Sequence, residues 1–184
     1  AYTIGMRIGV RLLGEIYGKD KEAKKLNDFV ADRRSLVGSK LSDIPDSKKI
    51  SCYMANPDLT TYGTGKYVGV IRDRAGGINV ARDINGYKTV NMEQILKWNP
   101  SVIFIQDRYA KKVWPQVTKD PAWASIKAVK SKKVYITPEY VKPWGHPTPE
   151  SMALGELWMA NKLYPAQFKD VDMNKYVQEF YKTF

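Results

Sequence analysis

An apolar run in the second half of the chain reads Ser101-Val102-Ile103-Phe104-Ile105. Four consecutive apolar side chains would point to both faces of a strand, and a strand buried on both faces is typical of a parallel sheet covered by helices. Further short runs near 50–55, 78–81 and 133–137 share this texture and alternate with helical segments. The sequence therefore predicts an α/β fold with a small, mostly parallel sheet flanked by helices.

Helices are expected between these strands and on both sides of them. The best-marked one follows Thr148, because Thr148 supplies an N-cap oxygen, Pro149 fits the first helical position and Glu150 suits the positive end of the helix. The helices expected after the first strand span 66–74, 91–98, 108–117, 148–163 and 173–184.

Two more helices are expected before the first strand. The first carries apolar residues at four-residue spacing, which places them on one face, and Gly18 is a natural stop. The second runs from Lys19 to about Leu41, and the break at Gly18-Lys19 is either a turn or a kink. The apolar stripe of the first helix consists of Ile4, Ile8, Leu12 and Ile16.

The composition indicates one globular domain, or one large lobe of a larger protein, with an excess of basic residues. With 184 residues, 43% of them hydrophobic, the chain is long enough to bury a core without disulfides or structural metals. Its net charge of +11 suits an anionic partner, whether a nucleic acid, an anionic membrane or an anionic ligand. Cys52, the only cysteine, lies in an apolar run and is expected to be a buried, inert thiol.

In open parallel sheets, ligands bind outside the carboxyl ends of the strands, so the residues that follow each strand form the candidate site. After the first strand come Tyr62, two glycines, several hydroxyl groups and Lys66, which together would suit an anion. The segment lacks the spacing of a phosphate-binding P-loop, and a plain strand-to-helix turn that needs glycine is the alternative.

The third and fourth strands lead into further polar and aromatic residues. Arg108 and Tyr109 follow the third strand, where the arginine would either clamp an anionic oxygen or be solvated. The loop after the fourth strand combines two aromatic rings with an imidazole, although a histidine beside a helix start also serves to cap or pack. These loop residues are Tyr140, Trp144 and the only histidine, His146.

The sequence lacks the motifs of several kinds of metal site and enzyme. No paired histidines, CxxC motif or His/Cys/Asp cluster would hold a bare metal, and the Gly-x-Ser-x-Gly elbow of hydrolases is missing. An α/β enzyme stays open as an alternative and would need an acid near His146, for which Glu139 is the nearest in sequence. A nucleic-acid binder is the third option, but the basic residues are spread over many helices without a recognised motif, so we expect no nucleic-acid partner.

Four segments follow one another in a familiar order and spacing. They read GEIYGKDKEAKKL at 14–26, AGGINVA at 75–81, VNMEQILKWNPSVI at 90–103 and WASIKAVKSKKVY at 123–135. On these segments the chain resembles the substrate-binding proteins of ABC importers, the class III periplasmic binding proteins for ferric siderophores, haem, cobalamin and related metal chelates. The resemblance covers essentially the whole chain.

The resemblance implies two α/β lobes joined by a long rigid helix, with the ligand in the cleft between them. Residues 1–41 then correspond to the connecting helices, residues 48–184 to the carboxyl-terminal lobe, and the amino-terminal lobe is missing from the sequence. The resemblance also implies a non-enzymatic protein of the periplasm, with a lipid anchor on the missing amino-terminal part, that delivers its ligand to an ABC permease in the inner membrane. Without that lobe the apolar stripe is uncovered, so the chain is expected to self-associate.

The resemblance also assigns roles to single residues. Glu93 matches the acid that docks onto the permease, and a helix capped by Asn91 would hold it at the surface, although first-turn acids are common for that reason alone. The expected ligand is an Fe(III) siderophore, with a Ni(II) chelate as the close alternative and cobalamin as a poorer fit. His146 would fill an open position on the chelated metal. The residues expected to line the cleft are Tyr62, Lys66, Arg108, Tyr109, Tyr140, Trp144 and His146.

Overall fold

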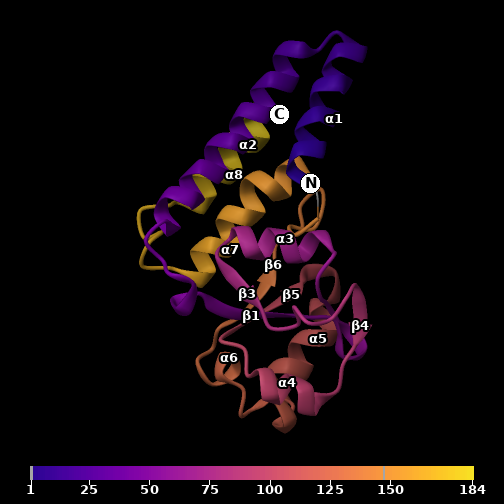
Figure 1. Cartoon of the computed structure of the whole chain (residues 1–184), viewed down its shortest axis with the longest axis vertical. Helices are drawn as coiled ribbons and strands as arrows, with labels where there is room; N and C mark the ends of the chain where they lie inside the picture. The colour runs from indigo at the N-terminus through magenta and orange to yellow at the C-terminus, as the bar shows by residue number, and fades with distance from the viewer. Residues whose placement is uncertain (1, 147) are drawn as a thin grey trace.

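A parallel sheet forms the centre of the molecule (Figure 1). The computed structural model describes residues 2–146 and 148–184, and within them this sheet has four strands in the order β3-β1-β5-β6. Each neighbouring pair is parallel, which confirms the predicted α/β fold. The strands span Gly77–Asn79 (β3), Ile50–Ala55 (β1), Val102–Gln106 (β5) and Val134–Thr137 (β6).

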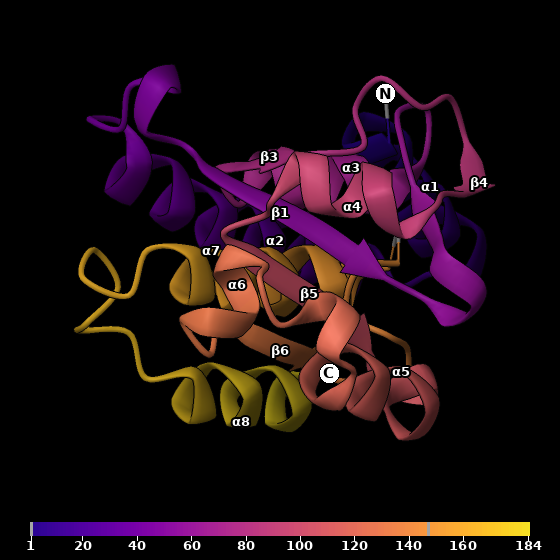
Figure 2. The same ribbon diagram turned by 90° about the horizontal axis from the view of Figure 1, so that it is seen from below.

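Helices cover both faces of the sheet, as two views of the molecule show (Figure 1 and Figure 2). One face packs against α2 (Asp20–Leu41), α3 (Tyr67–Arg74), α7 (Glu156–Leu163) and α8 (Met173–Thr183). The other packs against α4 (Met92–Trp98), α5 (Asp107–Lys119) and α6 (Lys127–Lys130). Alternate residues of a strand reach opposite layers: Cys52 and Met54 of β1 belong to one core, and Tyr53 and Ala55 to the other.

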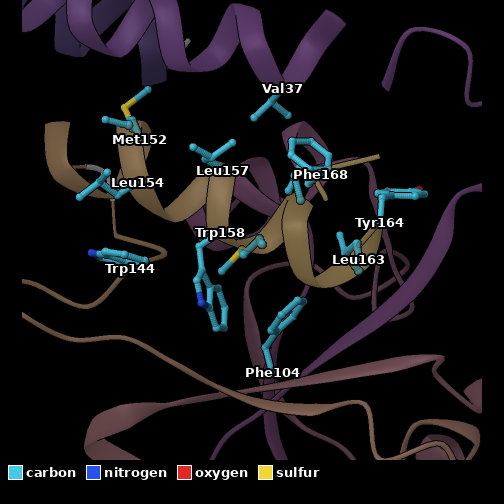
Figure 3. Close-up of a cluster of buried hydrophobic side chains, with 14 of the residues drawn as sticks. Val37, Phe104, Trp144, Met152, Leu154, Leu157, Trp158, Leu163, Tyr164 and Phe168 are labelled. Atoms are coloured by element: carbon cyan, nitrogen blue, oxygen red, sulfur yellow. The ribbon is translucent and has the colours of Figure 1, made fainter. Parts of the chain in front are cut away.

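The core between the sheet and α7 is rich in aromatic rings (Figure 3). Phe104 of β5 points toward Trp158 with ring centroids 5.8 Å apart, and Trp158 meets Trp144 at 6.3 Å. Burial of a large apolar side chain contributes about 1.5–3 kcal/mol, so this cluster anchors the loop that carries Trp144. Cys52 is fully buried in the same core, and burial raises the pKa of its thiol to about 11, as expected of an inert thiol.

The chain begins with a helical hairpin. Helix α1 (Tyr2–Tyr17) lies against α2, and Gly18 between them adopts a positive φ of 62°. The helices approach closely at Gly14, where an added Cβ would lie 2.5 Å from Cβ of Ala23. The break at Gly18 is therefore a tight turn and not a kink, and residues 2–41 form a helical hairpin instead of one long helix.

The outer stripe of α1 is uncovered in this chain. Its exposed fractions reach 67% at Ile4 and 73% at Ile16, far above those of core residues. None of the described helices is long and apolar enough to cross a membrane.

The helix predicted over 148–163 forms, but its middle is a π-helical turn, η4 (Ser151–Gly155), which the sequence did not indicate. Thr148 caps it as predicted, since its Oγ1 accepts a hydrogen bond from the Ser151 amide at 3.3 Å. The sequence also did not indicate the antiparallel strands β2 (Thr60–Tyr62) and β4 (Tyr87–Thr89), or α6. Single turns of 3₁₀ helix lie at Asp46–Lys48 (η1), Pro57–Leu59 (η2) and Pro121–Trp123 (η3).

Candidate ligand-binding site

The carboxyl ends of β1, β5 and β6 meet at one edge of the sheet. β1 leads through β2 to Tyr62, β5 leads directly to Arg108 on α5, and β6 leads to the loop 138–146. Arg108 lies close enough to Tyr62 and His146 for their charges to influence one another's pKa. The structure thus brings these three predicted residues together, as the strand-end rule leads one to expect.

Arg108 is held by an acid from the loop that follows the neighbouring strand, β6. Its Nη2 and Nε donate hydrogen bonds to the two carboxylate oxygens of Glu139, at 2.7 and 3.2 Å. This two-point contact raises the pKa of Arg108 above its already high ordinary value. The guanidinium is therefore a permanent cation with a fixed orientation at the edge of the sheet.

A second ion pair lies one helical turn further along α5. Lys112 Nζ contacts Asp58 Oδ1 at 2.8 Å, and Asp58 belongs to the segment that follows β1. Asp58 and Leu59 both have positive φ angles, 58° and 54°, so this segment turns sharply to bring the carboxylate under α5. The two cations of α5 therefore pair with acids from the segments that follow β1 and β6, the strands on either side of β5.

His146 is half-buried at the end of the same loop. Burial lowers the pKa of its imidazole, the positive charges of Arg108 and Lys142 lower it further, and only Glu139 acts in the opposite direction. The imidazole is therefore neutral at pH 7, with one N–H donor and one nitrogen acceptor.

Tyr62 is held through its side chain and through its backbone carbonyl oxygen. Its hydroxyl accepts a hydrogen bond from Gln106 Nε2 at 3.5 Å, and its ring packs on Tyr87 at 4.7 Å. Its carbonyl oxygen accepts from Asn79 Nδ2 at 3.0 Å and from Arg72 Nη2 at 3.2 Å. Sequence reasoning missed Asn79 and Arg72, because nothing local marks either residue as a neighbour of Tyr62.

Arg72 is a fully buried arginine beneath this site. Its Nε and Nη1 have no hydrogen-bond partner within the described residues, and burial lowers the pKa of its guanidinium.

The aromatic residues of the loop 138–146 divide into an exposed and a buried group. Tyr140 is 59% exposed and lies between Trp144 at 5.5 Å and Tyr181 of α8 at 5.7 Å. Trp144 is only 2% exposed, and its Nε1 donates to Glu150 Oε1 at 2.9 Å. Trp144, expected to line the cleft, instead lies in the core, where its ring packs edge-on against that of Trp158.

The two other expected residues are placed differently. Lys66 lines a separate hollow of about 460 Å³ beside the open edge of β3, together with Lys49, Asp73 and Arg82, so it does not join the cluster around Arg108. Tyr109 packs against the second core, and it lies close enough to Arg108 to raise the pKa of that guanidinium, as Tyr62 does.

The glycine-containing segment after β2 is a structural turn. The amides of Gly63 and Thr64 donate to Gly86 and Ile84 carbonyl oxygens at 2.8 and 2.7 Å, so they are not available to an anion. A Cβ on Gly63 would lie well inside the contact distance of the Ile84 carbonyl oxygen. The plain-turn alternative therefore explains these glycines.

Glu93 occupies the predicted surface position. It is exposed in the first turn of α4, and Asn91 Oδ1 caps this helix by accepting from the Gln94 amide at 2.8 Å. Within the part of the chain that the structure describes, no group of three or more His, Cys, Asp or Glu side chains could hold a bare metal ion.

A parallel α/β lobe with a cationic, aromatic carboxyl edge is the architecture of a ligand-binding lobe. The chain belongs to the periplasmic binding protein family, whose sequence model matches residues 9–141. This confirms the resemblance found in the sequence.

Several proteins are similar to this chain in sequence or in structure. The molybdate-binding protein MolA of Haemophilus influenzae is 46% identical over 100% of this chain and 52% of its own length. A solved structure of MolA bound to molybdate superposes with a TM-score of 0.89, covering 100% of this chain and 56% of that one. The Bacillus subtilis protein YvrC, described as an uncharacterised ABC transporter substrate-binding lipoprotein, is 28% identical over 88% of this chain and 50% of its own.

A structure of Helicobacter pylori CeuE with Ni(II) bound is 25% identical, with a TM-score of 0.70, over 88% of this chain and 52% of that one. The chain thus spans about half the length of the curated relatives it matches. These relatives are binding proteins and not enzymes, which agrees with the non-enzymatic prediction.

Proposed function

We propose that the chain forms the carboxyl-terminal lobe of an ABC-importer binding protein that captures a tetrahedral oxyanion of the molybdate class. The observation that carries this proposal is the cationic edge built by Arg108, Lys112 and Lys142 next to a neutral His146. The 46% identity to a molybdate-binding protein over the whole chain supports the same ligand class.

The donors at this edge suit a small dianion. A guanidinium offers parallel N–H groups that match two oxygens of a tetrahedral anion, and charge-assisted hydrogen bonds of this kind are the strong ones. The neutral imidazole of His146 and the hydroxyl of Tyr62 add donors without bringing a bare negative charge to the ligand.

A metal chelate is the second candidate. The neutral imidazole of His146 could fill an open position on a chelated metal, and the exposed ring of Tyr140 could cover an aromatic chelator. The Fe(III) siderophore and Ni(II) chelate expected from the sequence therefore stay in the test as competitors. The 46% identity to a molybdate-binding protein ranks them below the oxyanion.

We also propose the domain organisation expected from the resemblance, with connecting helices over 1–41 and the lobe over 48–184. A second lobe would provide the other wall of the cleft and cover the exposed stripe of α1. Self-association of the chain through this stripe is the alternative, and light scattering distinguishes the two. A monomeric chain at high concentration would exclude self-association.

The partner would be an ABC permease, with Glu93 as the docking acid on the exposed start of α4. We place the protein in the periplasm on the strength of its family. The lipid anchor expected from the resemblance stays a prediction.

Calorimetric titration of the full chain tests the ligand class. Sodium molybdate, a ferric catecholate and a nickel–histidine complex are compared as ligands of the wild type, of Arg108→Gln and of Arg11→Gln. Arg11 is a matched control, because it is an exposed arginine that pairs with Glu15 on α1 at 2.9 Å. Molybdate should bind the wild type and Arg11→Gln alike, and Arg108→Gln about 10- to 100-fold more weakly, since a hydrogen bond to a charged group contributes about 1.5–3 kcal/mol. Saturable binding of a metal chelate but not of molybdate would overturn the oxyanion proposal.

A further inference from the structure

The ligand-binding edge carries its own negative charges. Both cations at the start of α5 are occupied by acids of this chain: Glu139 on Arg108 and Asp58 on Lys112. In these two ion pairs, each positive charge is balanced by one negative charge. A ligand anion that approaches Arg108 therefore meets the carboxylate of Glu139 as well as the guanidinium.

We infer that Glu139 is an internal competitor, which occupies Arg108 in the empty site and is displaced by the ligand; this inference rests on the proposed function. Glu139 is thereby a specificity-determining residue: only an anion that binds the guanidinium better than a carboxylate does can take its place. A dianion with several oxygens satisfies this condition, whereas chloride or nitrate does not.

The geometry of the pair supports competition. Glu139 occupies the Nε and Nη2 donors of Arg108, which form the side-on fork that a tetrahedral oxyanion would use. If the ligand bound while Glu139 stayed in place, the Glu139 carboxylate and the anionic ligand would both contact the Arg108 guanidinium. Two negative charges so close together repel each other.

The loop allows Glu139 to leave. Its closing end is fixed by the hydrogen bond from the Trp144 amide to the Pro138 carbonyl oxygen at 3.0 Å and by the burial of Trp144. The tip between these points is open to solvent, with Val141 exposed by 72%. The Glu139 side chain can therefore turn outward by a change of rotamer while the backbone contacts of the loop persist.

Displacement also changes the charge at the edge. Once Glu139 has turned away, its carboxylate no longer offsets the positive charges of Arg108 and Lys142 that act on His146. The site would thus be less positive while empty and more positive once Glu139 has left Arg108, which favours dianions over monoanions.

The test compares anion binding by wild type, Glu139→Gln and Glu15→Gln, using calorimetry with sodium molybdate, sulfate and nitrate. Glu15→Gln is the matched control: it removes the carboxylate partner of another exposed arginine, Arg11, at 2.9 Å on α1, and leaves the Arg108–Glu139 pair intact. We expect Glu139→Gln to bind molybdate about fivefold more tightly and to gain measurable nitrate binding, and Glu15→Gln to change molybdate affinity less than about twofold.

A double variant separates competition from a general effect of charge. In an Arg108→Gln background, the added Glu139→Gln change should no longer improve molybdate binding, because the competitor has lost its target. If the improvement persists there, Glu139 acts through the overall field of the edge and the competitor role is refuted.

The remaining outcomes are equally decisive. Wild-type binding of molybdate with equal or weaker binding by Glu139→Gln would leave the proposed function intact and refute the competitor. Binding by Glu139→Gln but not by the wild type would support the competitor and show that the chain alone is too weak without this change. Failure of both proteins to bind any of the anions would refute both proposals.

Discussion

Tyr181→Phe removes one hydroxyl from the network that supports the ligand loop. Tyr181 donates to Glu150 Oε1 at 2.5 Å, and the same oxygen accepts from Trp144 Nε1 at 2.9 Å. A hydrogen bond to a charged group contributes about 1.5–3 kcal/mol, and we take about 1.5 kcal/mol because Tyr181 is partly exposed. For a chain of this size that loss lowers Tm by about 3–6 °C.

The assay is urea and thermal unfolding followed by circular dichroism, with Tyr176→Phe as the control. Tyr176 lies on the same helix and keeps its ring contact with Arg33, 4.6 Å from the guanidinium, while its hydroxyl forms no hydrogen bond with any described residue. The control should stay within about 0.5 kcal/mol of the wild type. Equal stability of the two variants would refute the argument that this network holds the loop.

The same variant has a defined dependence on pH. Burial, followed by the hydrogen bond to Glu150, raises the pKa of Tyr181 above its ordinary value. The hydroxyl therefore stabilises the fold fully below about pH 10, where an unfolded tyrosine begins to ionise, and progressively less as the pH rises beyond that value. The difference in stability between wild type and Tyr181→Phe should accordingly shrink above pH 10.

Two further predictions concern the turn after β2 and the histidine. Gly63→Ala should lower the free energy of unfolding by about 3 kcal/mol, because its Cβ would collide with the Ile84 carbonyl oxygen. The control Gly38→Ala has open space around its Cβ and should be neutral or stabilising by up to about 1 kcal/mol. Equal urea midpoints for the two variants would contradict this prediction. The pKa of His146, followed by NMR, should lie below the ordinary 6.5 and should rise in Arg108→Gln, because a positive neighbour is removed; an unchanged or lower value in the variant would show that Arg108 does not act on His146.

The sequence predicts those parts of the fold that depend on short-range patterns. Apolar runs such as 101–105 mark the central strands, because a strand buried on both faces has no polar positions. The π-helical turn at Ser151–Gly155 depends on Trp144 and the Gly145 amide packing against it, which are contacts that no periodicity reveals. β2 and β4 are three residues each and lack an apolar run.

The candidate site likewise contains residues that the sequence could place and residues that it could not. Tyr62, Arg108 and His146 come together because the carboxyl ends of parallel strands share one edge, which is a rule of topology. Lys66 and Trp144 depart from the prediction because their direction depends on packing: one lines a hollow beside β3 and the other fills the core. Arg72 could not be identified from the sequence, since its burial beneath Tyr62 depends on how α3 sits on the sheet.

The central claim is that an oxyanion binds at Arg108. The most direct test is an NMR titration of the full chain with sodium molybdate, following the Arg108 Nε–Hε signal, the His146 ring protons and the Arg11 Nε–Hε signal as a reference. The account predicts saturable shifts at Arg108 and His146 with Arg11 unchanged. Saturable shifts confined to other residues, such as Arg82 in the hollow beside β3, or no saturable shift at all, would contradict it.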